Sequence, residues 1–217
     1  MSKKPQPPAD ERLKDSFVTG AYGLDGPDDA LKFYAEWADG YDARIEGRLG
    51  YIAARVMAER LAAHLDDRSA AVLDIGCGTG LTCQYLADLG FATFDGIDIT
   101  PEMIVKARER GIYRDLYQAD ITEPLDMADA AYDAAISSGT FTFGHVGSEP
   151  IPEIARVLKP GALFACTIHT DVWQAKGFET AFDALEAAGA MRRVEICLDK
   201  AFSGLGRTLM YCVFERL

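Results

Sequence analysis

Residues 72–80 read VLDIGCGTG, and this stretch decides the fold. A short apolar run ends around Asp74, and Gly76, Gly78 and Gly80 follow at alternate positions before a helix-like segment. Apolar residues bury a strand, and glycines permit a turn so tight that the backbone can approach a ligand. The spacing is one residue shorter than the Gly-x-Gly-x-x-Gly of dinucleotide enzymes. It predicts a loop for a nucleoside-like ligand without a phosphate over the helix, with Asp74 available to an ammonium group.

The rest of the chain alternates between strand and helix patterns from about residue 70 onward. Strands are expected at residues 70–75, 92–99, 113–119, 132–137, 162–168, 191–198 and 207–215, and helices at 81–89, 101–110, 150–158 and 178–188. Such alternation predicts a mainly parallel sheet with helices on both faces. Only a short loop separates the last two strands, so we expect them to form an antiparallel hairpin.

The N-terminal part has a different pattern. Residues 28–67 carry apolar side chains at three- and four-residue steps, which predicts helices. The chain starts with prolines and polar residues, so residues 1–27 are expected to be a flexible tail. The remaining residues, 28–217, are expected to form one domain that includes the helical segment.

The composition excludes several classes of function. A net charge of −12, without a Lys/Arg cluster, argues against nucleic acid as a partner. No apolar run approaches the ~20 residues that span a bilayer, so no membrane partner is expected. The five cysteines include no Cys-x-x-Cys pair, so we expect no metal site, reduced thiols and a cytoplasmic location.

The segment Asp-Ile-Gly-Cys-Gly-Thr-Gly resembles the first motif of class I S-adenosylmethionine-dependent methyltransferases. The resemblance extends through YAEWADGYD at 34–42, GIDITPEM at 96–103 and RVLKPG at 156–161, and so covers nearly the whole chain. The nearest group is the Williams-Beuren syndrome region methyltransferase-like proteins. The resemblance implies a Rossmann-like α/β fold with a seven-stranded sheet of order 3-2-1-4-5-7-6. It also implies that the N-terminal helices, 28–67, form a lid.

An acid at the tip of the second expected strand, Asp98, is the candidate for the ribose hydroxyls. We prefer it to Asp95, which points to the opposite face of the strand. The alternative is that Asp98 only caps the helix that starts near Pro101. Ile99 and Met103 are placed to pack on the adenine ring.

The family resemblance assigns further roles. It implies that Asp120 and Ile121, after the third strand, contact the adenine; the alternative is that Asp120 is a turn residue before Thr122. It implies that Ser137 and Ser138, at the tip of the fourth strand, lie against the sulfonium and the substrate. An Asn-Pro-Pro-Tyr-like segment is missing there, which argues against methylation of the amino groups of bases or amides.

Two histidines are candidates for a general base, because a near-neutral pKa suits proton acceptance from a hydroxyl. His145 follows the fourth strand, as the base does in some small-molecule O-methyltransferases, and is our catalytic candidate. His169, at the end of the fifth strand, is the competitor. A surface or capping role remains the alternative for His145.

Aromatic residues of the helical segment have two interpretations. Most of them are expected to pack helices together. By resemblance, Tyr41, and more weakly Trp37, would cover the cofactor, where a ring near a sulfonium gains about 0.5–2 kcal/mol of cation–π attraction. Trp173 would either wall the acceptor pocket or pack in the core.

The resulting hypothesis is an enzyme that transfers a methyl group from S-adenosyl-L-methionine to a small molecule, through an oxygen or a nitrogen. The expected cofactor-binding set is Tyr41, Asp74, Gly76, Cys77, Gly78, Gly80, Asp98, Ile99, Met103, Asp120, Ile121, Ser137 and Ser138. A non-catalytic S-adenosylmethionine-binding sensor or partner subunit is the alternative, and a dehydrogenase comes third. The sequence leaves the acceptor and the oligomeric state open.

Overall fold

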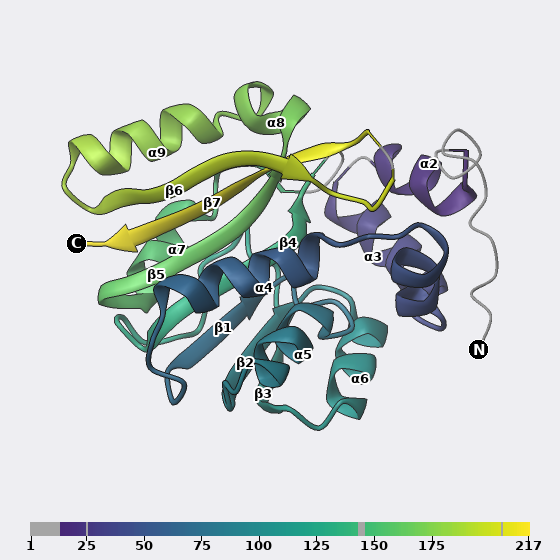
Figure 1. Cartoon of the computed structure of the whole chain (residues 1–217), viewed down its shortest axis with the longest axis horizontal. Helices are drawn as coiled ribbons and strands as arrows, with labels where there is room; N and C mark the ends of the chain where they lie inside the picture. Colours follow the sequence, from purple (N-terminus) through teal and green to yellow (C-terminus); the bar gives the residue numbers. More distant parts are fainter. Residues whose placement is uncertain (1–13, 25, 143–145, 205) are drawn as a thin grey trace.

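The computed structural model of the chain describes residues 14–24, 26–142, 146–204 and 206–217, and Figure 1 shows its architecture. Its strands form one seven-stranded sheet of order β3-β2-β1-β4-β5-β7-β6. β7 runs antiparallel to β5 and β6, and the other neighbours are parallel. The predicted strand order and the closing hairpin are confirmed. The strands are β1 (Ala71–Ile75), β2 (Thr93–Asp98), β3 (Tyr113–Gln118), β4 (Tyr132–Phe141), β5 (Leu158–His169), β6 (Met191–Lys200) and β7 (Thr208–Arg216).

Helices cover both faces of this sheet, as the alternating pattern predicted. The described helices are α2 (Ser16–Tyr22), α3 (Pro27–Trp37), the π-helix η1 (Ala43–Arg48), α4 (Ala53–His64), α5 (Leu81–Asp88), α6 (Pro101–Glu109), α7 (Ile151–Val157), α8 (Thr170–Ala175) and α9 (Phe178–Ala187). One face packs against α4 and α5, and the other against α7, α8 and α9. In Figure 1, α2 and α3 lie at one end of the sheet, near the tip of β4.

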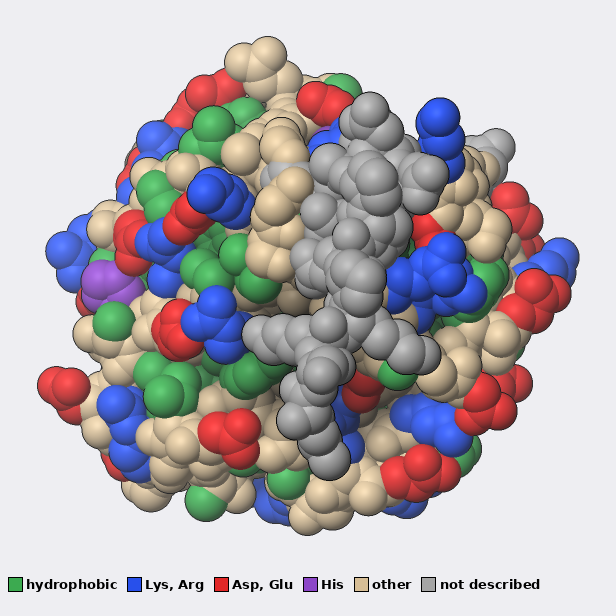
Figure 2. Space-filling model, turned by 45° about the vertical axis from the view of Figure 1, so that its right-hand side comes forward, with side chains coloured by type: hydrophobic (Ala, Val, Ile, Leu, Met, Phe, Trp, Pro, Cys, Tyr) green, Lys and Arg blue, Asp and Glu red, His purple; other side chains and the backbone are tan. Residues whose placement is uncertain are grey.

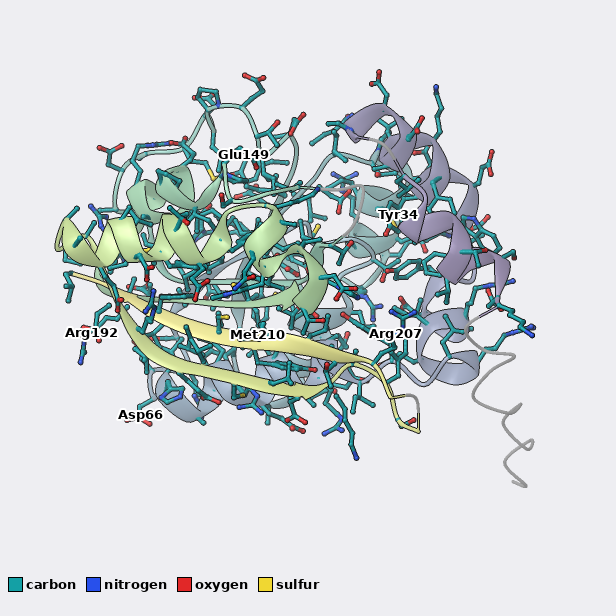
Figure 3. All side chains as sticks on the ribbon, turned by 90° about the horizontal axis from the view of Figure 1, so that it is seen from above. Tyr34, Asp66, Glu149, Arg192, Arg207 and Met210 are labelled. Atoms are coloured by element: carbon teal, nitrogen blue, oxygen red, sulfur yellow. The ribbon has the colours of Figure 1, made fainter. Side chains whose placement is uncertain are left out.

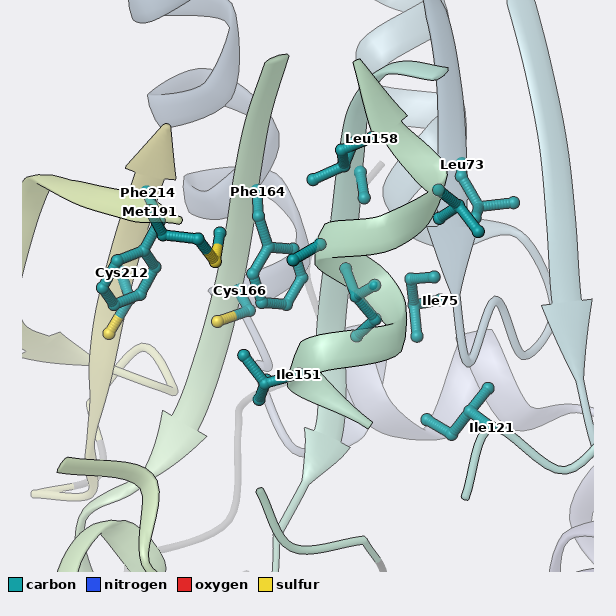
Figure 4. Packing of buried hydrophobic residues seen from close by; sticks show 14 of the residues in the cluster. Leu73, Ile75, Ile121, Ile151, Leu158, Phe164, Cys166, Met191, Cys212 and Phe214 are labelled. Carbon is teal, nitrogen blue, oxygen red and sulfur yellow. The ribbon is translucent and has the colours of Figure 1, made fainter. Parts of the chain in front are cut away.

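Two hydrophobic clusters hold these layers together. On one face, Phe164 and Phe214 of the sheet are fully buried with Ile151 of α7. Figure 4 shows this packing, in which α7 lies directly over the strands. On the other face, Met57 of α4 is buried against sheet residues that include Tyr211. Burial of an apolar side chain of this size contributes about 1.5–3 kcal/mol, so the two clusters fix the sheet between its helices.

The N-terminal region differs from the sequence prediction. Residues 16–22 form α2, although a flexible tail was expected over residues 1–27. Asp15 caps the helix by accepting a hydrogen bond from the Phe17 amide at 2.9 Å, and it pairs with Arg44 at 2.6 Å. Phe17 is buried among the rings of the lid. Arg44 and the rings of the lid lie in later segments, so the local composition did not reveal these contacts.

Some strand and helix ends also differ. β4 was expected to end at Ser137 but continues to Phe141, because pairing with β5 resumes at Ile168 after a shift in register. The short helix α8 was not predicted; it starts directly after β5, with His169 as its cap. None of the helices in the described ranges is long and apolar enough to cross a membrane.

Candidate active site

A cavity of about 860 Å³ opens at the C-terminal ends of the parallel strands, under the N-terminal helices. Ligand pockets typically measure about 300–1,000 Å³, so this cavity has the size of a ligand pocket. Its walls come from the loop after β1, the tips of β2, β3, β4 and β5, and the lid residues Phe17, Tyr34 and Tyr41. The strand order reverses between β1 and β4, where open α/β sheets bind their ligands.

The glycine loop forms one wall. Gly76, Gly78 and Gly80 have φ angles of +64°, +53° and +83°, in the region that favours glycine. A Cβ on Gly78 would meet no atom within 4 Å, whereas one on Gly76 would lie 2.3 Å from Thr140 Oγ1. Gly78 therefore leaves cavity space for a ligand, and Gly76 lets the loop approach β4. Cys77 also lines the cavity and donates its amide to Ile97 O at 2.8 Å.

Gly80 serves a different purpose. It is not among the lining residues of the cavity. It caps α5, and a Cβ there would lie 2.8 Å from the Tyr113 ring. Gly80 therefore has a packing role here, and its contact with the cofactor stays a prediction.

Asp98 lies at the tip of β2, in the cavity wall. Its Oδ2 accepts a hydrogen bond from the Gly78 amide at 2.7 Å, and its Oδ1 accepts one from the Thr100 amide at 2.8 Å. Burial raises the pKa of this carboxyl. Each carboxylate oxygen has two acceptor sites, so both oxygens retain capacity for a ligand hydroxyl. Asp98 thus braces the start of α6 and faces the cavity as well.

The residues predicted to surround adenine come together next to Asp98. Ile99, Met103, Asp120 and Ile121 all line the cavity. Asp120 Oδ1 accepts hydrogen bonds from the Thr122 amide at 2.9 Å and the Thr122 hydroxyl at 2.7 Å. Asp120 is therefore a turn residue and a cavity residue, so the two interpretations of it are compatible.

Asp74 lies elsewhere than predicted. Its side chain is buried beneath the loop, and its Oδ2 accepts a hydrogen bond from the Tyr113 hydroxyl at 2.6 Å. It is not a lining residue. Burial raises its pKa to about 6, although hydrogen bonds from Tyr113 and Cys83 lower it. The expectation that Asp74 faces an ammonium group disagrees with this geometry, in which it supports the loop from below.

The two predicted serines of β4 have different positions. Ser138 lines the cavity, and its Oγ lies 3.2 Å from the Tyr51 hydroxyl. Ser137 is fully buried and donates to Ile75 O at 2.8 Å, so it joins β4 to β1. Tyr51 was missed in the sequence, because nothing in its position before α4 relates it to the tip of β4.

The histidine candidates have different outcomes. His145 lies outside the described residues. His169 lines the cavity and is buried, and its Nδ1 accepts the Asp171 amide at 3.2 Å. Burial lowers its pKa, although Asp171 raises it. In the neutral ring, the proton therefore resides on Nε2.

The lid is attached to the glycine loop through polar contacts. Asp42 Oδ1 accepts a hydrogen bond from the Thr79 hydroxyl at 2.6 Å, and Asp42 also pairs with Arg110. Tyr41 lines the cavity and packs on Phe17, with ring centroids 5.5 Å apart. Trp37 is not a lining residue, and the Arg44 guanidinium lies 4.3 Å from its ring centroid.

Three further observations concern metal ligands, Trp173 and surface charge. Among the described residues, no group of three or more His, Cys, Asp or Glu side chains could hold a metal ion. Trp173 is not a cavity residue; it stacks on Phe182 with centroids 6.1 Å apart. On the face shown in Figure 2, the lysine and arginine side chains in view lie among acidic ones.

Comparison with known proteins supports this architecture. A family model described as a methyltransferase domain matches residues 73–166, from β1 to β5. Human methyltransferase-like protein 27 is 34% identical over 178 residues, which cover 79% of this chain and 72% of the human protein. Bovine 18S rRNA (guanine-N(7))-methyltransferase is 40% identical over 72 residues, 33% of this chain and 25% of that protein.

Solved structures share the fold at low sequence identity. One is in the complex between the Haloferax volcanii Trm112 methyltransferase activator and the putative methyltransferase. It has a TM-score of 0.63 and 21% identity, and the match covers 84% of this chain and 96% of that one. The glycine loop, the sheet order and the extended similarity to the human protein all indicate the same family. The chain belongs to the class I S-adenosylmethionine-dependent methyltransferases, and S-adenosylmethionine is its cofactor.

Proposed function

We propose that this protein transfers the methyl group of S-adenosylmethionine to a small molecule bound in the cavity. The observation that carries the proposal is the continuity of this cavity. It extends from Asp120 and Asp98, past the glycine loop and the tip of β4, to the end of β5 and the start of β7. One space can therefore hold the donor and an acceptor side by side.

The residues present fit the methyl donor. Gly78 leaves open space where any other residue would place a Cβ, and Asp98 retains acceptor capacity for the ribose hydroxyls. Ile99 and Ile121 supply apolar surface for adenine, with Asp120 at its edge. When bound, the donor would supply a methyl group activated by its positively charged sulfur, and methylation of an acceptor would release the neutral thioether S-adenosylhomocysteine. The protein then contributes positioning and the exclusion of water.

The lid favours a small acceptor. Phe17 of α2, Tyr34 of α3 and Tyr41 line the cavity, so these N-terminal helices form part of its wall. A bulky macromolecular acceptor would have to displace these helices from their packed positions. The net charge of −12 further disfavours a polyanion such as nucleic acid.

Proton acceptance is the remaining chemical task, because a hydroxyl or ammonium acceptor must lose a proton on methylation. We retain His145 as the proposed base, since Nδ1 of His169 already accepts the Asp171 amide and Nε2 carries the proton of the neutral ring. His145→Ala should abolish turnover and leave S-adenosylmethionine binding unchanged. Unchanged turnover would reject this role, and His169→Ala is the matched comparison.

The decisive experiment is a screen for S-adenosylhomocysteine release with the full chain and small hydroxylated, carboxylated and amine-bearing metabolites. We expect turnover with at least one small acceptor and none without acceptor. Tight S-adenosylmethionine binding with no turnover on any of them would favour the sensor or partner-subunit alternative. Methylation only of RNA or protein substrates would contradict the proposal.

A further inference from the structure

The end of the cavity beyond the tip of β4 is formed by β5, β7 and α8. His169 ends β5, Lys176 follows α8, and Arg207 precedes β7, and all three line the cavity. His169 is the register partner of Leu209, two residues after Arg207, so these segments meet at one edge of the sheet. Figure 3 shows Arg207 at the same end of the sheet as Tyr34, and Arg192 at the opposite end.

Charge changes sign along this cavity. The strand order β3-β2-β1-β4-β5-β7 places Asp120 and Asp98 at one end, Ser138 in the middle, and Lys176 and Arg207 at the other end. In the proposed function, the donor occupies the acidic half, because its ribose and adenine lie at Asp98 and Asp120. The acceptor is then left with the basic half.

Two acidic residues described near the basic half are more exposed than its cations. Glu149 lines the cavity but is exposed, and the Asp171 side chain beside His169 is 62% exposed. Water screens such exposed charges strongly. Lys176 and Arg207 are half-buried, so a ligand in the cavity experiences their charges with less screening.

The donors at this end suit an anionic oxygen pair. An ammonium has three N–H donors and a guanidinium five, so each can serve a ligand in addition to its protein contacts. A guanidinium matches the two oxygens of a carboxylate in a parallel pair of hydrogen bonds.

We propose that the methyl acceptor carries a carboxylate, which binds between Lys176 and Arg207 at the β5–β7 end of the cavity. This inference rests on the proposed function, because the donor must take the acidic half. Lys176 and Arg207 are specificity residues in this account; neither takes part in the transfer of the methyl group.

The test measures binding, so it does not require the natural acceptor. The full chain, saturated with S-adenosylhomocysteine, is titrated calorimetrically with benzoate, hydrocinnamate and succinate, each compared with its neutral amide. We expect at least one carboxylate to bind roughly tenfold or more tightly than its amide, as expected for a charge-assisted hydrogen bond. The double variant Lys176→Gln/Arg207→Gln should bring that ratio close to one. Arg192→Gln, at the opposite end of the sheet, is the matched control and should leave it unchanged.

The outcomes separate this inference from the proposed function. Equal binding of each acid and amide, or no binding of any carboxylate to the loaded protein, would overturn the inference. A ratio that survives the double variant would overturn it as well. S-adenosylhomocysteine binding is measured on the same samples; if it fails, the proposed function fails too, and if it persists, only the carboxylate site is rejected.

Discussion

At the scale of single residues, the glycine loop shows which roles a local pattern can predict. The Gly-x-Gly-x-Gly spacing predicted a tight turn, and the three glycines all have positive φ. The position of Asp98 at a strand end predicted that it would face the ligand crevice, and it lines the cavity. Asp74, at the end of the apolar run, was also predicted to face the ligand. Its side chain is instead buried and accepts a hydrogen bond from Tyr113 of β3. A long-range hydrogen bond of this kind leaves no signal in the local sequence.

The first prediction concerns Asp98. Asp98→Asn keeps the size of the side chain but removes its charge and one of its two acceptor oxygens. In the unmodified protein, these oxygens accept hydrogen bonds from the Gly78 and Thr100 amides. We expect S-adenosylmethionine affinity to fall by about tenfold or more, because a hydrogen bond to a charged group contributes about 1.5–3 kcal/mol. Titration calorimetry measures the change. Asp66→Asn, an exposed acid at the far end of the sheet (Figure 3), is the control, and equal affinities in the two variants would refute the ribose assignment.

The second prediction concerns the pH dependence of stability. Burial raises the folded-state pKa of Asp74 from 3.8 to about 6, so the folded protein keeps a proton that the unfolded chain has lost. The resulting stabilisation is complete below the unfolded pKa and disappears as the pH rises through about 6.

Asp74→Asn should remove this dependence. We expect the loss of unfolding free energy between about pH 4.5 and pH 7 to be smaller in the variant, by roughly 1–3 kcal/mol. Urea unfolding at the two pH values measures it, with the exposed helix residue Asp88→Asn as the control. An identical pH profile in Asp74→Asn and the unmodified chain would show that this carboxyl ionises normally.

At the scale of elements, periodic segments were predictable and cap-dependent ones were not. Strands β1 to β7 were all expected near their observed positions, because buried strands need continuous or alternating apolar residues. α2 depends on Asp15 and its ion pair with Arg44, and α8 depends on the His169 cap. Neither helix is long enough to show a clear helical period in the sequence.

The third prediction tests the attachment of the lid. Arg110, the C-cap residue of α6, pairs with Asp42 and donates to the Thr79 carbonyl, so it joins the lid to the glycine loop. Arg110→Gln should increase amide hydrogen exchange over residues 41–50 and weaken S-adenosylmethionine binding. Lys106→Gln is the control, since its partner Asp39 on the same lid is 90% exposed and such pairs contribute about 0–1 kcal/mol. Equal exchange in both variants would show that Arg110 does not hold the lid.

At the scale of the whole molecule, the sheet order followed from the family resemblance together with the alternating pattern, and the structure confirms it. Several residues that line the cavity could not be predicted in this way. Tyr51, Lys176 and Arg207 reach it from three segments far apart in the sequence, so only the folded chain brings them to the site. Their positions are the part of the site that local sequence could not reveal.

The central claim is that one cavity binds the methyl donor across β1 and β2 and leaves its other end for an acceptor. The most direct measurement is a crystal structure of the full chain grown with S-adenosylhomocysteine. The account predicts ribose hydroxyls on Asp98, adenine between Ile99 and Ile121, and the sulfur facing Ser138 with the β5–β7 end still open. A cavity that excludes the ligand, or a ligand bound elsewhere on the molecule, would contradict it.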